Sequence, residues 1–316
     1  MFLVAGEALV DMIPEPGRTE HFVARPGGSP FNVALALGRL SAPVSFLCPF
    51  SGDSFGRTLR RVASEGGVDL QLAPQFAGLS TVGFVARRAE DGLPDYAFYT
   101  EGTAGCGLRA ADLPEDLPRG LQAVHVGSFS LDTPPFSEAI DALLDRMPPG
   151  IAVSVDPNVR PFLVRNRSAF SKRLQRVVDR ASVVKISDED LEWWRPGLTG
   201  AVFARETLER GAGLVVVTEG AVGARAFSTR GEAFVATPEV EVADTVGAGD
   251  TFQAAMLNWL RDHDRLRAEN LFALDKSDLE SMLRYAHAAA ALNVQRVGCD
   301  PPTRAELAQN LDGAPS

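Results

Sequence analysis

Several patterns that mark common protein classes are missing from this sequence of 316 residues. It has no run of about 18 apolar residues, so it predicts no membrane-spanning helix. It has no Gly-Lys dipeptide and no HExxH, which argues against a Walker A loop and against a helical zinc site. The first apolar run leads into GEALVD instead of GxGxxG, so a dinucleotide-binding dehydrogenase has little support.

Cysteine is also scarce. Cys48, Cys106 and Cys299 lie far apart, so they form neither a CxxC metal spacing nor a disulfide framework, as is usual in a reducing cytosol. The first residues, MFLVAGEALVD, have no basic lead, and Glu7 and Asp11 interrupt their apolar stretch. We therefore expect no signal peptide and a cytoplasmic protein.

The chain is acidic, with 31 basic and 41 acidic residues and a formal charge of −10. An acidic surface repels phosphate backbones, so we expect no nucleic-acid partner, although a small phosphate compound can still bind locally. With 45% hydrophobic and 23% charged residues, the composition is that of a soluble globular protein. The length fits two domains of about 150 residues, or one large α/β domain with an appendage.

Short apolar runs alternate with helical patterns, which predicts a parallel sheet flanked by helices in a doubly wound α/β fold. We expect buried strands at 2–5, 44–50, 123–129, 151–157, 181–187 and 213–220. We expect helices from the cap Ser29 to about residue 40, and at about 54–64, 134–146, 168–179, 199–210, 251–262, 277–296 and 303–310.

Two segments break this alternation. Residues 12–25 and 81–100 have the pattern of half-buried strands, with turn residues at Pro14, Pro16 and Gly17 and at Asp91-Gly92. No helical pattern adjoins either segment, so we expect a small separate sheet that stands off as a lid, built from about 12–25 and 81–104. No long linker occurs, and we predict one domain over residues 1–316.

The segment DTVGAGDTF, residues 244–252, follows the strand-like EAFVATPEVEV and opens a helix. Gly247 and Gly249 let the backbone turn tightly and bring N–H groups against a ligand. The helix N-terminus adds unpaired donors and a partial positive charge, which together favour an anion. A carboxylate at that point is useful if it takes a proton from an attacking hydroxyl, so we interpret Asp250 as a general base. The alternative is that Asp250 merely caps the helix.

A second cluster, ARPGGSPFNVALALGRL, holds Gly27 and Gly28 before a helix and Asn32 in its first turn. The side-chain amide offers a donor and an acceptor, which suits a polyhydroxy ligand. A simple glycine-rich entry to a helix is the alternative explanation.

A third cluster, VDPNVRPF at residues 155–162, ends a predicted strand with Asp156, Asn158 and Arg160. Ligands in open α/β sheets bind beyond the carboxyl ends of the strands. Arg160 could hold a transferring phosphoryl group there, or it could be a solvated surface charge.

The five residues GDSFG at 52–56 match the GxSxG pattern of a hydrolase nucleophile elbow, with three histidines further along the chain. No HGGG-type oxyanion segment accompanies them. A helix start capped by Asp53 or Ser54 is the simpler explanation.

Taken together, these segments resemble the ribokinase-like (PfkB) family of carbohydrate kinases. DTVGAGDTF is similar to the C-terminal signature of that family, and GGSPFNVALALGRL is similar to the N-terminal one. Six more segments keep the family's order: GEALVD, GDSFGRTLRRVASEGGVD, VDPNVRP, KISDEDL, VVVTEGAVGA and AAAALNVQRVG. The resemblance implies a three-layer α/β/α sandwich with a mostly parallel, doubly wound sheet, and a small β-sheet lid over the sugar through which a homodimer forms. It also gives GDSFG a routine structural position.

The roles of the family, carried over by position, imply ATP-dependent phosphorylation of a sugar hydroxyl. Asp250 would be the base, Gly247, Ala248 and Gly249 the anion hole, and Arg160 a contact to the phosphoryl group or the sugar. The sugar would be bound by Asp11, Gly27, Gly28, Asn32, Tyr99, Arg160 and Asp250. The nucleotide would be bound by Lys185, Ser187, Thr218, Gly220, Gly223, Gly247, Gly249 and Asn293, the last near the adenine. Asp190 would order water around Mg²⁺, and Asp244 and Thr245 resemble the start of a site for a monovalent cation such as K⁺.

Within the family, GEALVDMIP, GGSPFNVA and DPNVRPFL look closest to fructokinases, which implies conversion of D-fructose to fructose 6-phosphate. The 2-keto-3-deoxygluconate kinases are the nearest rival, with Arg160 and Arg25 as candidate partners for the substrate carboxylate. Another sugar or nucleoside kinase of the family, or a sugar sensor without activity, are further alternatives. Thr100 follows Tyr99 where fructokinases commonly have arginine, and we assign no role to Cys299.

Overall fold

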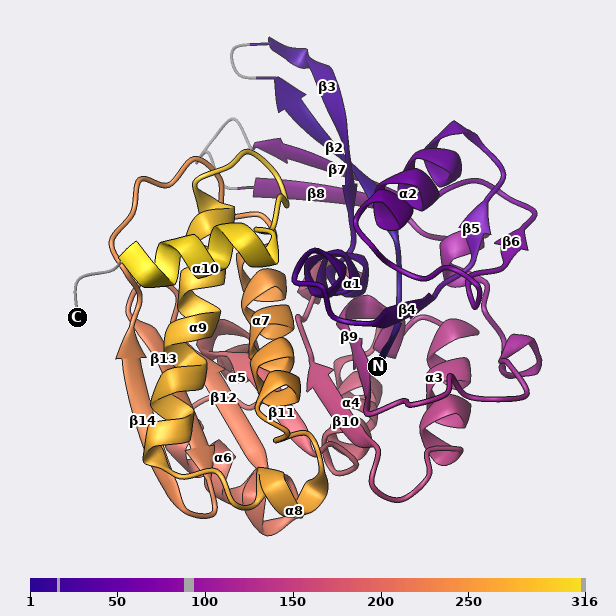
Figure 1. Cartoon of the computed structure of the whole chain (residues 1–316). Helices are drawn as coiled ribbons and strands as arrows, with labels where there is room; N and C mark the ends of the chain where they lie inside the picture. Colours follow the sequence, from indigo (N-terminus) through magenta and orange to yellow (C-terminus); the bar gives the residue numbers. More distant parts are fainter. Residues whose placement is uncertain (16–17, 88–93, 314–316) are drawn as a thin grey trace.

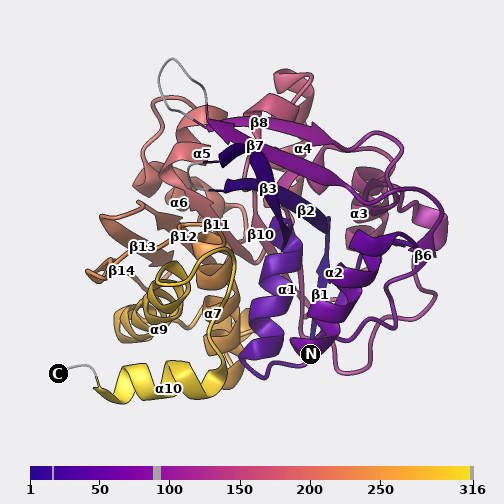
Figure 2. The same cartoon turned by 90° about the horizontal axis from the view of Figure 1, so that it is seen from above.

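The computed structural model describes residues 1–15, 18–87 and 94–313. The body of the molecule is a three-layer sandwich in which helices cover both faces of one eight-stranded sheet (Figure 1 and Figure 2). The strand order is β14-β13-β12-β11-β10-β9-β1-β4. The strands are β1 (Phe2–Ala5), β4 (Val44–Leu47), β9 (Ala123–Gly127), β10 (Ala152–Asp156), β11 (Val183–Ser187), β12 (Leu214–Thr218), β13 (Gly223–Ser228) and β14 (Gly231–Ala236).

The sheet is parallel from β4 to β12, and β13 and β14 add an antiparallel edge. Parallel strands are buried on both faces, which is why they are continuous apolar runs in the sequence. The predicted α/β/α sandwich with a mostly parallel, doubly wound sheet is confirmed. The prediction missed β13, because GARAFS contains no apolar run, and it extended the following strand to residue 242, whereas β14 ends at Ala236.

Two groups of helices sandwich the sheet. In Figure 2, α1, α7 and α9 lie on one side of it, and α3, α4, α5 and α6 lie on the other. The helices are α1 (Ser29–Arg39), α2 (Ser54–Glu65), α3 (Phe136–Asp145), α4 (Arg167–Val178), α5 (Asp188–Trp194), α6 (Gly200–Glu209), α7 (Ala248–Asp262), α8 (Ala268–Leu271), α9 (Lys276–Val294) and α10 (Arg304–Gly313). Short 3₁₀ turns occur at η1 (Ala104–Cys106), η2 (Ala110–Asp112), η3 (Ser128–Leu131) and η4 (Pro161–Leu163).

A separate four-stranded sheet stands above the body (Figure 1). Its strands are β2 (Leu9–Glu15), β3 (Arg18–Gly27), β7 (Val82–Arg87) and β8 (Pro94–Tyr99), in the order β3-β2-β7-β8. The two segments predicted to form a small sheet therefore do so. Of the predicted turn residues, Pro14 lies within β2, paired with Phe22, so the strand extends past it. Pro16-Gly17 and Asp91-Gly92 lie outside the described residues. Two short strands, β5 (Phe50–Ser51) and β6 (Gln75–Phe76), pair beside α2.

Two helix starts decide local questions left by the sequence. The N-cap of α1 is Gly28, with φ 101°, so Ser29 is the first helical residue and not the cap. Asp53 caps α2, where its carboxylate accepts from the Gly56 N–H at 2.8 Å. The GDSFG segment is therefore a capped helix start, as the simpler explanation held.

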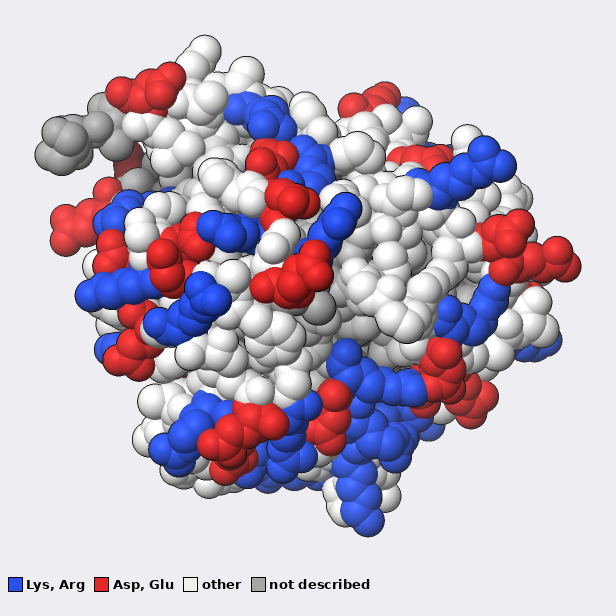
Figure 3. Space-filling model, turned by 60° about the horizontal axis from the view of Figure 1, so that its bottom comes forward, with Lys and Arg blue, Asp and Glu red and all other residues white. Residues whose placement is uncertain are grey.

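The surface away from the lid mixes both signs of charge. Figure 3 brings this underside forward and shows acidic and basic side chains interspersed over most of it. Exposed ion pairs such as Arg210 with Asp179 join neighbouring segments of the body. Exposed pairs contribute only about 0–1 kcal/mol each, so the buried apolar core carries the stability of the body. No helix within the described ranges is both long and apolar enough to span a bilayer.

Candidate active site

The predicted site residues gather where the parallel strands end and the lid begins. Asp156, Ser187 and Thr218 are the last residues of β10, β11 and β12. The N-terminus of α7 points at the same edge, and β2 of the lid leaves the body directly after β1. This is the edge at which open α/β sheets bind their ligands.

Asp250 lies in the first turn of α7, after Gly247, the N-cap, in the left-handed conformation at φ 74°. Its side chain is only 7% exposed. The Ser29 hydroxyl donates to Oδ1 at 2.7 Å, and Nδ2 of Asn32 donates to Oδ2 at 2.8 Å. Nδ2 of Asn158 lies 3.4 Å from Oδ1. The predicted pair of Asp250 and Asn32 is thus in direct contact.

Burial raises the pKa of Asp250, while the hydrogen bonds from Ser29 and Asn32 oppose that rise. A raised pKa makes a carboxylate a better proton acceptor at neutral pH. The Oδ1 atom of Asn32 has no hydrogen-bond partner within the described part of the chain and is buried. It therefore leaves an acceptor for a ligand hydroxyl beside the carboxylate.

Asp11 faces this region from the lid strand β2. Burial raises its pKa to about 6, with Arg160 lowering it and Asp250 raising it, so both charges are near. Two glycines make room for its carboxylate. A Cβ on Gly27 would lie 2.2 Å from Oδ2, and a Cβ on Gly83 would lie 3.1 Å from Oδ1. Gly27 is thus explained by the space that Asp11 needs, without a direct ligand contact.

Gly28 has a structural reason as well. Its φ of 101° disfavours any residue with a side chain, and a Cβ there would lie 2.8 Å from the carbonyl oxygen of Glu7. The glycine-rich entry to α1 is therefore required by the fold, and its sugar contact stays a prediction.

The Tyr99 prediction needs correction. Tyr99 is 62% exposed and packs edge to face on Phe84 at 5.9 Å, on the outer face of the lid. Its neighbour Phe98 is paired with Gly83, which is paired with Asp11, so Phe98 shares the inner face with that carboxylate. Successive strand residues point to opposite faces, and the sequence alone does not show whether residue 98 or residue 99 faces the site.

Cationic groups line the other side of the site. Nζ of Lys185 donates to Oδ2 of Asp156 at 2.7 Å, and both side chains are almost fully buried. A Cβ on Gly249 would lie 3.5 Å from that Nζ, so the ammonium lies beside the predicted anion hole. Arg160 is held by its own loop, because Nη1 donates to Oδ1 of Asn158 at 2.6 Å and to two carbonyl oxygens nearby.

Ser187 and Asp190 form the start of α5, a helix that the prediction missed behind its run of acids. The Ser187 hydroxyl caps the helix by accepting from the Asp190 N–H at 3.0 Å. Oδ1 of Asp190 accepts from the Val159 N–H at 3.1 Å. Burial, and then Asp156, raise the pKa of Asp190 to about 6.

The residues predicted to line the nucleotide lie along the next strands. Thr218 is half-buried at the end of β12, and Gly220 has φ 52° in the turn that follows. Gly223 begins β13, where a Cβ would lie 2.5 Å from the Val235 carbonyl oxygen. Strand pairing therefore accounts for Gly223 without a ligand.

The loop before α7 is tied to the loop after α9. Asp244 accepts from the backbone N–H groups of Val246 and Gly298 at 3.1 and 2.8 Å, and Thr245 beside it is exposed. Asn293 is fully buried; Nδ2 donates to the Val246 carbonyl at 2.8 Å, and Oδ1 accepts from the Asp300 N–H at 3.0 Å. This arrangement argues against the predicted adenine contact of Asn293 and makes it a clamp between the two loops.

Sequence reasoning missed four residues of the site. Ser29 was interpreted as a helix cap, Asn158 had no role, and Phe98 was passed over for Tyr99. Glu7 is 1% exposed, burial raises its pKa, and its carboxylate accepts from the Ser130 hydroxyl. A charged residue two positions after a buried strand was the available signal for Glu7.

Comparison with known proteins agrees with the predicted fold and family. The model of the pfkB family carbohydrate kinases matches residues 2–306. A fructokinase of Rhizobium leguminosarum bv. trifolii is 38% identical over 285 residues, which are 89% of this chain and 86% of that protein. A fructokinase from Xylella fastidiosa with bound ATP superposes with a TM-score of 0.89 at 28% identity, covering 98% of both chains. A double mutant of fructokinase from Vibrio cholerae O395, with fructose, ADP and a potassium ion bound, superposes with a TM-score of 0.83 at 26% identity, covering 98% of this chain and 97% of that one. The chain therefore belongs to the pfkB family of carbohydrate kinases.

Proposed function

We propose that this protein is a fructokinase, which transfers the γ-phosphoryl group of ATP to D-fructose and forms fructose 6-phosphate. The observation that carries the proposal is the buried Asp250 carboxylate, held by Ser29 and Asn32 at the N-terminus of α7. It accepts the proton of the attacking sugar hydroxyl. The similarity to fructokinases over most of the chain supports fructose as the sugar.

The sugar lies between the lid and the body in this proposal. The Asp11 carboxylate and the free Oδ1 of Asn32 accept hydrogen bonds from its hydroxyl groups. The ring of Phe98 covers one side. Holding the hydroxyl at Asp250 converts a bimolecular encounter into a positioned reaction.

The backbone N–H groups of Gly247, Ala248 and Gly249 bind the phosphoryl group as it transfers, and Lys185 and Arg160 contribute positive charge nearby. The residues fit Mg²⁺ held through water by Asp190, since Mg²⁺ keeps several waters and needs only one or two carboxylates. No group of three metal-ligating side chains occurs among the residues that the structure describes, which fits such an arrangement. Bound Mg²⁺ neutralises phosphate charge. We further propose that Asp244 and Thr245 begin a K⁺ site, because the Asp244 carboxylate already joins their loop to the backbone N–H of Gly298.

We propose that the protein acts in the cytoplasm as a homodimer formed through its lid, with each chain a single domain. The outer face of the lid carries Met12, Phe22, Phe84 and Tyr99, of which Phe22 and Tyr99 are exposed. Phe84 contacts both rings edge to face, at 5.3 and 5.9 Å. A second copy of the same sheet would cover this apolar face.

The test is ADP release from ATP and Mg²⁺ with D-fructose, 2-keto-3-deoxygluconate, ribose and glucose, compared by kcat/KM. We expect the highest value with D-fructose. A preference for the keto acid would keep the reaction and replace the substrate. If none of these sugars causes ADP release while ATP still binds, the result would contradict a kinase of these sugars and favour a sensor.

A further inference from the structure

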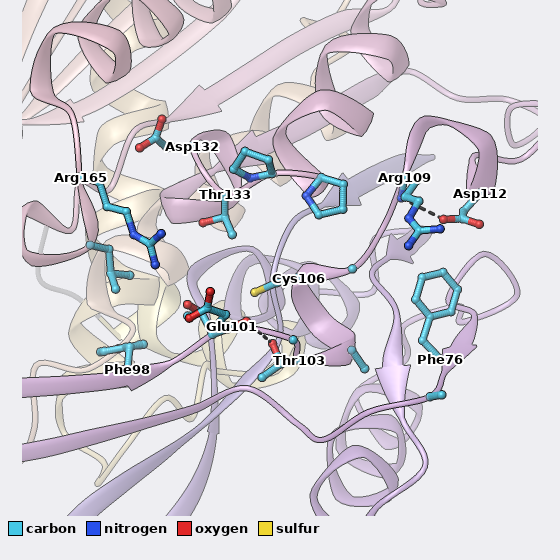
Figure 4. Close-up of a pocket in the computed structure, with 18 of the residues that line it drawn as sticks. Phe76, Phe98, Glu101, Thr103, Cys106, Arg109, Asp112, Asp132, Thr133 and Arg165 are labelled. Atoms are coloured by element: carbon cyan, nitrogen blue, oxygen red, sulfur yellow. Dashed lines mark hydrogen bonds between the residues drawn. The ribbon is translucent and has the colours of Figure 1, made fainter.

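A cavity of about 780 Å³ opens where the lid strand β8 returns to the body (Figure 4). Phe98, Phe162 and Leu163 line one end of it. Phe98 also borders the proposed sugar site, because a Cβ on Gly83 would lie 2.8 Å from its ring and 3.1 Å from Oδ1 of Asp11. A sugar at Asp11 and Asp250 therefore has this cavity as its neighbour on the far side of Phe98.

Five charged side chains line the cavity, of which Arg109, Asp112 and Asp132 are three. At one end, Asp112 accepts from the backbone N–H of Arg109 at 2.9 Å, and the two side chains lie together in Figure 4. Asp132 is partly buried and attracted by Arg173, which lies outside the cavity.

The other two, Glu101 and Arg165, are exposed, and neither makes a hydrogen bond or ion pair with any residue in the described ranges. Glu101 follows β8, and Arg165 follows η4 on the body. In Figure 4 their charged ends point toward one another from opposite walls.

We infer that Glu101 and Arg165, which face one another across this cavity, offset each other's charge and together favour a neutral sugar over a sugar acid. The inference rests on the proposed function, since it concerns the substrate of the same site. An unpaired guanidinium binds a carboxylate with two parallel hydrogen bonds. The negative charge of Glu101 offsets that of the Arg165 guanidinium and repels a second carboxylate. With three carboxylates against two guanidinium groups, the lining itself carries no excess positive charge to attract an acid.

The other arginines considered for a substrate carboxylate are less suited to that role. Arg160 already donates to three oxygens of residues 158 and 159. Arg25 lies on β3 near Gly298, because a Cβ on Gly298 would lie 4.0 Å from Cδ of Arg25. Arg25 does not line the cavity. Of the two guanidinium groups that line the cavity, Arg165 is the one that Glu101 faces, whereas Arg109 lies beside Asp112.

The test compares the Kd of D-fructose and of 2-keto-3-deoxygluconate by calorimetry, in the full-length protein and in Glu101→Gln, Arg165→Gln and the double variant. Glu101→Gln keeps the shape of the side chain and removes its charge. We expect it to tighten the keto acid by about threefold to fivefold, the range of an exposed ion pair, with fructose changed less than about twofold. Arg165→Gln should abolish this gain in the double variant. Asp132→Asn is the matched control, because it removes one acid from the same cavity without touching the pair.

Equal changes in the Kd of the keto acid in Glu101→Gln and Asp132→Asn would overturn the inference, since they would reflect the summed charge of the cavity lining. So would an unchanged gain in the Arg165→Gln background, which would mean that the two side chains are not coupled. Failure to bind either ligand would also overturn it. The binding assay does not depend on phosphoryl transfer. A protein that binds both ligands with coupled effects and never releases ADP would refute the kinase proposal and leave the pair standing.

Discussion

Replacing Asp250 by asparagine tests the proposed base directly. The substitution keeps the size of the side chain and removes its ability to take a proton. The new amide can still accept from Nδ2 of Asn32 and donate to the Ser29 hydroxyl, which can act in either sense. The local structure should therefore survive. Because burial raises the pKa of Asp250, the ionised form is unfavourable in the folded protein, and its neutral replacement should not lower the Tm at pH 7.

The expected loss is in kcat. Removing a general base typically costs about 10²-fold to 10⁴-fold, which is about 3–5 kcal/mol of activation free energy. The Kd values of fructose and ATP should change much less, since the other proposed contacts remain. The assay is single-turnover formation of fructose 6-phosphate at saturating fructose and ATP. A variant that retains half of its kcat would refute the assignment of Asp250 as the base.

Ser29→Ala serves as the matched control, because it removes one hydrogen bond to the carboxylate and leaves the base in place. The bond from Ser29 lowers the pKa of Asp250, so its loss should raise that pKa. The acid limb of the kcat profile should then move to higher pH, with a smaller fall in the plateau than in Asp250→Asn. An unshifted limb would mean that Ser29 only supports the fold.

Three further outcomes are expected. The pKa of Asp11 is raised to about 6, so KM for fructose should rise as the pH falls through 6, and Asp11→Asn should have a high KM at every pH from 5 to 8. Asn293→Ala leaves the Val246 carbonyl and the Asp300 N–H without their buried partner, so chemical denaturation should show a loss of about 2–3 kcal/mol and kinetics a raised KM for ATP. Phe84→Arg should convert a lid-mediated dimer to a monomer in sedimentation velocity, while an unchanged sedimentation coefficient would contradict the proposed interface.

The parallel body was predictable because its strands are short, uninterrupted apolar runs, as in VVVT at 215–218. The antiparallel edge was not, because β13 carries glycine, alanine and an exposed arginine in place of such a run. Helix α5 was hidden for a related reason: its seven residues begin with three acids, which resemble a loop until Ser187 is found capping them.

The placement of the candidate site was predictable where one local segment determines it, as GAGD does at the start of α7. It was not predictable where the reason for a residue lies in another element. Gly27 is needed because Asp11 of the neighbouring strand fills the space of its side chain. Phe98, and not Tyr99, faces the site because the pairing of β8 with β7 sets the phase of the strand. The register between strands and the contacts between helices are set by the tertiary structure, and a single sequence shows neither.

The direction in which Asp250 points is itself a tertiary property. Its partner Ser29 lies 221 residues earlier in the chain, so this carboxylate is oriented by the packing of α1 against α7. One turn further along α7, Nε2 of the fully buried Gln253 donates to the Ser154 hydroxyl at 2.7 Å, and that hydroxyl lies 3.1 Å from Nδ1 of His125. Burial lowers the pKa of His125 to about 4, so the ring is neutral and brings no charge into the core. Apolar contacts have no direction, whereas hydrogen bonds do. These bonds therefore fix the rotation of α7 over β9 and β10, and with it the face of the helix from which Asp250 meets the ligand.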